Sequence, residues 1–228
     1  MTVRRLDNPA LDRLILTHLA DRYSIYQKRE GLHLSTLVYC LTRSFFDQLA
    51  PVLPTDEEVM LFATGYGLQE ILTPKSATTP TFEKDSILYR PDMVFPVTLK
   101  DIETLVEIKT TRAGVKRYLE GPLPETWIEY IAGGCYIKGT NTYERSVLYV
   151  AERPVPKIRS ETLIFDEPGE LESNWDYLLK RKEVYTRALA DNTPPTPFNF
   201  CKEWECKNCR YKMMCETIKL TINKEESK

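Results

Sequence analysis

The chain has 228 residues, six cysteines and a formal net charge of −2 at neutral pH. That length is sufficient for one domain with a sizeable core. No apolar N-terminal segment resembles a signal peptide, and no unbroken apolar run reaches about 18 residues. We therefore expect neither a secreted disulfide scaffold nor a membrane protein, but a cytoplasmic protein with reduced thiols.

Hydrophobic periodicity predicts an α/β chain with helices at both ends. The second helix follows Gly31 with Ser35 as its N-cap, and the third opens with a capping box formed by Thr55 and Glu58. The predicted helices span about 7–29, 33–50, 55–72, 124–138 and 169–190. The predicted strands span about 80–84, 86–95, 102–109, 145–152 and 160–165. Residues 192–200 are predicted to form an extended connector, and the tail 223–228 is predicted to be disordered.

Three charged residues lie in two of these strands: Asp92 in YRPDMVF, and Glu107 and Lys109 in LVEIKTT. The apolar neighbours Val106 and Ile108 predict a buried strand, which has no structural need for a carboxylate and an ammonium group. Because side chains alternate along a strand, Glu107 and Lys109 share one face, and Asp92 can meet them from the neighbouring strand of a hairpin. Two adjacent carboxylates favour a cation between them, and oxygen ligands suit Mg²⁺ or Mn²⁺.

The spacing D-x14-E-x-K, led by Pro91, resembles that of the PD-(D/E)xK nuclease superfamily. Taken alone, this short pattern has another explanation. An edge strand carrying a salt bridge between Glu107 and Lys109, with Asp92 in a turn, would produce the same residues. The motif therefore needs support from the rest of the chain.

A second motif lies near the C-terminus, where Cys206, Cys209 and Cys215 form a C-x2-C-x5-C arrangement with Cys201 just upstream. In a reduced protein such a set is more often a zinc or iron–sulfur site than a disulfide. A local zinc knuckle could use these four thiols. Cys40, far upstream in a predicted amphipathic helix, is either a further ligand or a buried thiol.

Together the motifs resemble the iron–sulfur branch of the RecB-like nucleases, most closely its stand-alone CRISPR-associated exonucleases. The matching order is S-x4-C, then Arg43, Phe45 and Phe46, then the acidic triad, then the three C-terminal cysteines, over roughly residues 33 to 216. The resemblance implies an α/β fold, a PD-(D/E)xK restriction-endonuclease-like core with a mixed central sheet, N-terminal helices and a C-terminal iron–sulfur cap.

The implied [4Fe–4S] cluster would be held by Cys40, Cys206, Cys209 and Cys215, which leaves Cys135 and Cys201 spare. We expect a single nuclease domain over 1–228, composed of a helical part (1–75), the nuclease core (76–192), the cysteine cap (193–220) and a tail (221–228). The implied activity is Mg²⁺- or Mn²⁺-dependent DNA hydrolysis, mainly exonucleolytic trimming of single strands. The implied setting is CRISPR adaptation, with CRISPR adaptation proteins as partners, or viral or phage DNA processing.

In this interpretation Asp92, Glu107 and the backbone carbonyl of Ile108 hold the metal. Lys109 orients the attacking water or stabilises the transition state. Where the family has a metal-binding histidine, this chain has Gln69, whose carbonyl oxygen could complete the ligand set.

The neighbouring Glu70 could offer a carboxylate instead. The family's Gln-x3-Tyr element falls near Tyr130 and Gly134 and is degenerate here. That departure affects the residues expected to position the substrate.

Because the net charge is slightly negative, DNA binding should depend on local basic clusters and on the metals. The first predicted cluster follows directly from the E-x-K strand and consists of Lys109, Arg112, Lys116 and Arg117. Tyr130, on the following helix, is a further candidate for DNA contact, with helix packing as its alternative. The second surrounds the cysteines, from Lys207 to Lys212, with Tyr211 available for base stacking. For both clusters, the alternative to DNA binding is an ordinary solvated charged surface.

Two other functions remain open from the sequence. The chain could be a catalytically silent DNA-binding subunit in which Gln69 marks a decayed site. It could also be a zinc-stabilised interaction protein that matches the triad by chance.

Overall fold

The computed structural model describes residues 9–23, 30–97, 102–114, 121–195, 202–207 and 209–226. The chain divides into two compact units, one made of Met1–Arg29 with Leu53–Leu72 and the other of Glu30–Val52 with Thr73–Lys228. Residues 30–52 therefore belong with the larger unit, although they fall within the predicted N-terminal helical part. None of the described helices is long and apolar enough to cross a membrane.

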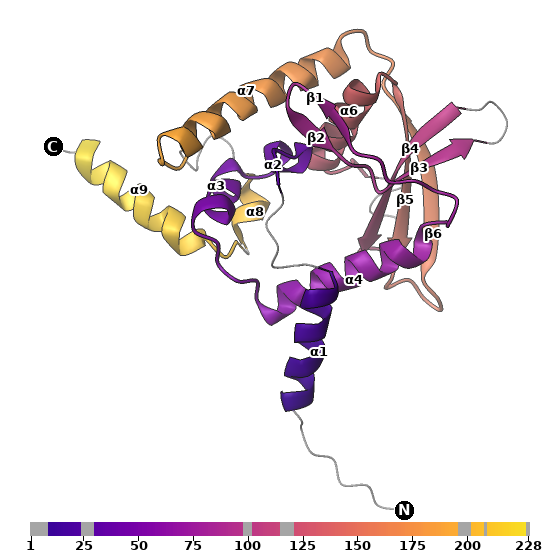
Figure 1. The fold of residues 1–228 in the computed structure, drawn as a ribbon, viewed down its shortest axis with the longest axis horizontal. Coiled ribbons are helices and arrows are strands. Elements are labelled where there is room, and N and C mark those ends of the chain that lie inside the picture. Colours follow the sequence, from indigo (N-terminus) through magenta and orange to yellow (C-terminus); the bar gives the residue numbers. More distant parts are fainter. Residues whose placement is uncertain are drawn as a thin grey trace, which may run out of the picture. The chain divides into compact units, whose positions relative to one another are not determined.

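The smaller unit consists of α1 (Pro9–Arg22) and α4 (Asp56–Leu72) (Figure 1). The predicted capping box at the start of α4 is confirmed. The backbone N–H of Thr55 donates to the Glu58 carboxylate over 2.9 Å, and the N–H of Glu58 donates to the Thr55 hydroxyl over 3.2 Å. This reciprocal pair satisfies two backbone donors that a helix start would otherwise leave without partners.

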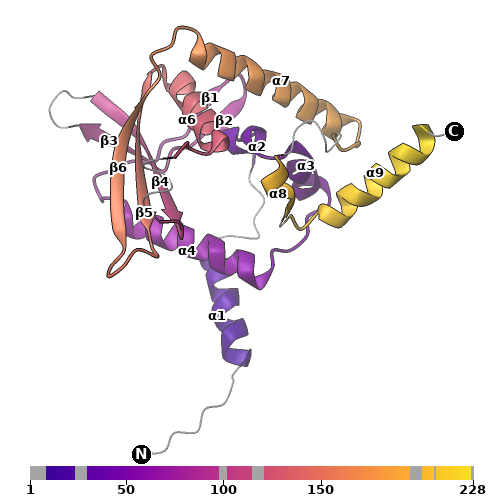
Figure 2. The ribbon, with the colours of Figure 1, turned by 180° about the vertical axis from the view of Figure 1, so that it is seen from behind.

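The larger unit contains the remaining elements (Figures 1 and 2). Its described helices are α2 (Leu34–Val38), α3 (Leu41–Leu49), α6 (Glu125–Lys138), α7 (Glu170–Ala190), α8 (Glu203–Lys207) and α9 (Lys212–Glu226). Its described strands are β1 (Phe82–Lys84), β2 (Ile87–Tyr89), β3 (Met93–Val97), β4 (Ile102–Thr111), β5 (Thr142–Tyr149) and β6 (Lys157–Ile164).

A four-stranded sheet with the order β3-β4-β5-β6 organises this unit. The central pair β4 and β5 is parallel, while β3 with β4 and β5 with β6 are antiparallel, so the sheet is mixed as predicted. Helix α6 lies in the connection between the two parallel strands, as such a crossover requires. Strand β4 pairs with β3 over Ile102–Val106 and with β5 over Val106–Thr111, so it is not an edge strand of this sheet.

The core lies on one face of the sheet. Burial alternates along β5, whose inward side chains include Tyr143 and Val147. Helix α6 contributes Ile131 and Cys135 to the same cluster, and α7 packs against α6, α2 and α3 with Trp175 inside (Figures 1 and 2). Strand β4, which contributes Leu105 to this cluster, therefore has one face against a helical layer.

Two predicted elements are interrupted. The helix expected over 33–50 is two helices, because the chain turns at Tyr39 and Cys40. The predicted cap at Ser35 is wrong: His33 precedes α2 and Cys40 precedes α3, where the Cys40 thiol accepts the N–H of Arg43 over 3.5 Å.

The strand expected over 86–95 is also divided, into β2 and β3, with Pro91 between them. Proline has no N–H to give to a strand ladder, so pairing stops there. Near the C-terminus, α9 continues to Glu226, so the prediction of a disordered tail from residue 223 is wrong for the described residues. Strands β5 and β6 each begin three residues earlier than predicted, at Thr142 and Lys157.

Candidate active site and cysteine cap

The three residues of the acidic motif meet within the larger unit. Asp92 precedes β3, and its Oδ2 accepts the backbone N–H of Ile108 over 2.6 Å. The antiparallel register that places Met93 opposite Val106 brings Asp92 to the middle of β4. The Lys109 ammonium donates to Oε1 of Glu107. The predicted hairpin geometry, with Glu107 and Lys109 on one face and Asp92 beside them, is therefore present.

Burial and charge act together on this group. Glu107 is only 3% exposed and lies on an interior strand. Burial opposes the charge of Lys109, but the carboxylates of Glu107 and Asp92 outweigh it and raise the Lys109 pKa above its usual value. Lys109 is therefore a fixed positive charge across the physiological range. Burial also raises the pKa of Tyr39, whose phenol is close enough to Lys109 and Glu107 to respond to both charges.

Tyrosines surround the acidic group. The Tyr143 hydroxyl donates to Oε2 of Glu107 over 3.4 Å, and the hydroxyls of Tyr143 and Tyr89 are 2.5 Å apart. The Tyr130 ring centroid is 5.8 Å from the Lys109 ammonium nitrogen, and the Tyr130 hydroxyl donates to the Arg90 carbonyl over 3.2 Å. Tyr130 therefore lies beside the predicted catalytic lysine while it also ties α6 to the loop before β3.

Sequence reasoning overlooked Tyr89, Tyr143 and Tyr39. Only the alternating pattern of TYERSVLY could have placed Tyr143 on the inward face beside Glu107.

Carboxylate oxygens are the donors that a hard divalent cation prefers. Glu107 on β4 and Asp92 just before β3 supply such oxygens, and Asp92 accepts the backbone N–H of Ile108. Among the described residues no group of three or more His, Cys, Asp or Glu side chains is arranged to hold a metal ion. Two carboxylates would therefore need additional oxygen ligands, which backbone carbonyls and water provide for Mg²⁺ and Mn²⁺.

The other predicted metal and DNA ligands are distributed over the chain. Gln69 and Glu70 lie on α4 in the smaller unit, where Glu70 pairs with Arg22 over 3.2 Å. Arg112 follows β4 directly and is exposed. Lys116 and Arg117 lie outside the described residues.

The tertiary structure brings the two segments that carry the predicted cluster cysteines together, although no three described thiols are arranged to hold a metal ion. Burial, together with the nearby thiols of Cys40, Cys209 and Cys206, raises the pKa of Cys215 to about 11. Burial likewise raises the pKa of Cys209, with Cys40 and Cys206 contributing. No disulfide joins the described cysteines. Cys40 is thus close to thiols more than 160 positions later in the chain. Cys201 lies outside the described residues.

A glutamate that sequence reasoning overlooked links the two cysteine segments. Oε2 of Glu205, the residue before Cys206, accepts the backbone N–H of Cys40 over 2.8 Å. Glu205 is 8% exposed, and burial raises its pKa. This bond ties α8 to the junction of α2 and α3, which lie next to α8 in Figures 1 and 2.

Tyr211 is part of the core, so the prediction that it stacks on DNA bases is wrong. Its side chain is 0% exposed, and its ring stacks on Phe46 with centroids 5.4 Å apart. The hydroxyl donates to Asp47 over 2.7 Å and accepts the N–H of Val52 over 3.1 Å. Arg210 from the same predicted cluster pairs with Asp47. This segment anchors α9 on α3.

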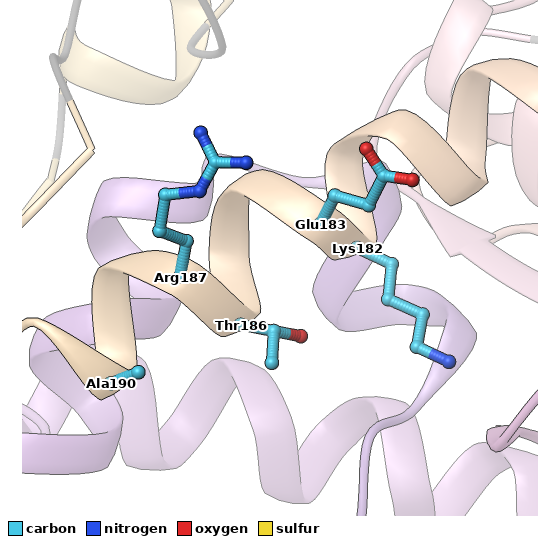
Figure 3. Close-up of a pocket in the computed structure, with 5 residues that line it drawn as sticks. All are labelled: Lys182, Glu183, Thr186, Arg187 and Ala190. Carbon is cyan, nitrogen blue, oxygen red and sulfur yellow. The ribbon is translucent and has the colours of Figure 1, made fainter.

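A shallow hollow on α7, shown in Figure 3, contains none of the predicted site residues. It is lined by Lys182, Glu183, Thr186, Arg187 and Ala190. All five come from neighbouring turns of one helix, so the hollow has no opposing wall among its lining residues.

No protein family and no curated protein matches the sequence. Among solved structures, the chain is similar to the crystal structure of SSO0001, with 15% identity, a TM-score of 0.54, and coverage of 90% of this chain and 96% of that one. It is also similar to an alkaline exonuclease, LHK-Exo from Laribacter hongkongensis, with 11% identity, a TM-score of 0.43, and coverage of 71% and 93%. A TM-score of 0.43 does not establish a shared fold with this exonuclease. The chain therefore shares its mixed α/β fold with SSO0001.

Proposed function

We propose that this protein is a metal-dependent DNA nuclease of the RecB-like type. The observation that carries the proposal is the placement of a buried glutamate, 3% exposed, on an interior strand, paired with Lys109 and flanked by Asp92. A buried carboxylate is costly unless it is paired or binds a cation. Three charged groups at the spacing of a nuclease motif, brought together by an antiparallel pair of strands, therefore indicate a catalytic site.

Each residue has a role in phosphodiester hydrolysis. Asp92, Glu107 and the Ile108 carbonyl, all in the larger unit, would hold one or two Mg²⁺ or Mn²⁺ ions. A bound ion of this kind supplies an acidified water and neutralises charge on the scissile phosphate. Lys109, kept protonated by its two carboxylate neighbours, would orient the attacking water or stabilise charge in the transition state.

The proposed substrate is DNA, in single-stranded form, trimmed from its ends. Tyr130 beside Lys109 offers a ring for base stacking, and the exposed Arg112 continues from the catalytic strand. With a net charge of −2, the protein would bind phosphates through such local groups, with Lys116 and Arg117 as further candidates. The family resemblance favours work in CRISPR adaptation, and viral or phage DNA processing uses the same chemistry.

We further propose that Cys40, Cys206, Cys209 and Cys215 hold an iron–sulfur cluster, of the [4Fe–4S] type. Thiolates are the ligands these clusters use, and the thiols of Cys40 and Cys206 are close enough to Cys209 and Cys215 to help raise the pKa of these two residues. A cluster there would join residues near both ends of the larger unit. Closing so long a loop reduces the entropy of the unfolded chain and stabilises the fold.

The decisive experiment for the nuclease is Mn²⁺-dependent cleavage of end-labelled single-stranded DNA by wild type and two glutamine variants. Glu107→Gln should lower the rate about a hundredfold or more, because a site that loses its metal loses several kcal/mol of transition-state stabilisation. Glu103→Gln is the matched control: Glu103 lies on the same strand, but it is exposed and pairs with Lys138. It should cleave like wild type.

Wild type that leaves the DNA intact, with Mg²⁺ or Mn²⁺, would reject the nuclease and support a DNA-binding subunit. A circular single strand separates the modes of attack, because an exonuclease leaves it intact while an endonuclease opens it.

The cluster is tested on anaerobically purified protein by its visible absorption and iron content. Cys215→Ser should bleach the protein and remove the iron, whereas Cys135→Ser should retain both, because the buried Cys135 lies on α6 and donates to the Thr142 carbonyl. Stoichiometric zinc without iron would instead support a zinc-stabilised protein.

A further inference from the structure

Two buried phenols extend from Glu107 into the core. Tyr143, on β5, donates its hydroxyl hydrogen to Oε2 of Glu107 over 3.4 Å. The hydroxyl of Tyr89, at the end of β2, is 2.5 Å from that of Tyr143. Because Tyr143 has one hydrogen and gives it to Glu107, Tyr89 must donate to Tyr143. Both side chains are 0% exposed.

Each of the two oxygens of Glu107 has a defined partner: Lys109 on Oε1 and Tyr143 on Oε2. The carboxylate has a fixed orientation before any cation binds.

A glycine on α6 makes room for the far end of this chain. A Cβ atom at Gly134 would lie 2.6 Å from both Cζ and Oη of Tyr89. Neither partner can move freely, because Tyr89 is 0% exposed and Gly134 lies in the middle of a buried helix. Glycine is unfavourable in a helix interior, so its presence here has a steric reason.

We propose that Tyr143 and Tyr89 are positioning residues that fix Oε2 of Glu107 for metal binding, with Gly134 setting the place of the Tyr89 hydroxyl. This inference rests on the proposed nuclease site and adds its supporting residues. Hydrogen bonds to a ligating carboxylate orient it, and their loss typically weakens metal binding 10- to 100-fold. Without Tyr143, the Glu107 carboxylate would keep Lys109 as its side-chain partner among the described residues, and it could rotate away from the cation.

The experiment measures Mn²⁺ affinity by calorimetric titration, together with the melting temperature and the cleavage rate at saturating Mn²⁺. Tyr143→Phe should raise the Kd for Mn²⁺ about 10- to 100-fold, and Tyr89→Phe should raise it less. Gly134→Ala should also raise the Kd for Mn²⁺, although this substitution removes no polar atom.

Gly133→Ala is the matched control. Its Cβ would lie 3.0–3.1 Å from the side chains of Leu34 and Leu178, so its three nearest atoms belong to leucines and not to the tyrosine chain. Gly133 lies on the same helix as Gly134, is also buried, and would gain the same methyl group. It should keep Mn²⁺ affinity within about twofold of wild type, whatever its effect on the melting temperature.

The possible results separate the two claims. If wild type binds Mn²⁺ and cleaves DNA while Tyr143→Phe and Gly134→Ala bind Mn²⁺ equally well, the positioning role is overturned and the nuclease stands. If Gly133→Ala weakens Mn²⁺ binding as much as Gly134→Ala, general crowding of α6 explains the effect and the proposal fails. Wild type that neither binds Mn²⁺ nor cleaves overturns the nuclease and this inference together.

Discussion

Replacing Tyr211 by phenylalanine separates a structural role from a DNA-binding role for this residue. The ring would keep its stacking on Phe46, and only the hydroxyl would be lost. That hydroxyl donates to the Asp47 carboxylate over 2.7 Å and accepts the Val52 N–H over 3.1 Å. A hydrogen bond to a charged group contributes about 1.5–3 kcal/mol and a neutral one about 0.5–1.5 kcal/mol. Asp47 keeps its pairing with Arg210, so we expect a total loss of about 2 kcal/mol.

In a protein of this length, a loss of about 1 kcal/mol in the free energy of unfolding lowers the melting temperature by roughly 2–4 °C. Tyr211→Phe should therefore lower the melting temperature by about 4–8 °C. Calorimetry measures this shift. Tyr136→Phe serves as the control, because the Tyr136 ring stacks on Trp175 while its hydroxyl makes no hydrogen bond within the described part of the chain. Single-strand DNA affinity of folded Tyr211→Phe should equal that of wild type. An unchanged melting temperature combined with weaker DNA binding would refute the structural role.

Two further predictions concern the cysteine segments. Glu205→Ala should reduce the free energy of unfolding by about 1–3 kcal/mol more than Glu205→Gln, because of these two variants only glutamine keeps an acceptor for the buried Cys40 N–H. The alanine variant should therefore melt at the lower temperature, and equal melting temperatures for the two variants would contradict this prediction. Cys135 should resist alkylation by iodoacetamide at pH 8.5 in the native protein and react after denaturation, because burial raises its thiol pKa to about 12 and leaves it 0% exposed. Mass spectrometry of the digested protein locates the label, and rapid native labelling of Cys135 would show that α6 opens readily.

Local sequence determined several features of this protein. The capping box at Thr55 and Glu58 defined the start of α4, because both partners lie within one helical turn. The alternation around Glu107 predicted a buried strand with Lys109 on the same face, because side chains of a strand have a period of two. The D-x14-E-x-K spacing is compatible with the hairpin that brings Asp92 to Ile108.

Other features depended on contacts between distant segments. Nothing near Tyr89 or Gly134 in sequence indicates that the hydroxyl of one lies against the backbone of the other. The burial of Tyr211 follows from the packing of Phe46 and Asp47, which are more than 160 positions away. The Glu205 bond to Cys40 is equally remote.

Sequence alone therefore determined the acidic motif, the cysteine pattern and most of the helices and strands, because each depends on neighbours within one turn or one strand pair. Tertiary structure decided which tyrosines support Glu107, which cysteine segments meet and which aromatic residues are buried. Those outcomes depend on how the sheet register and the packing of α3, α6 and α7 place side chains that are far apart along the chain. Local propensity carries no information about such pairings.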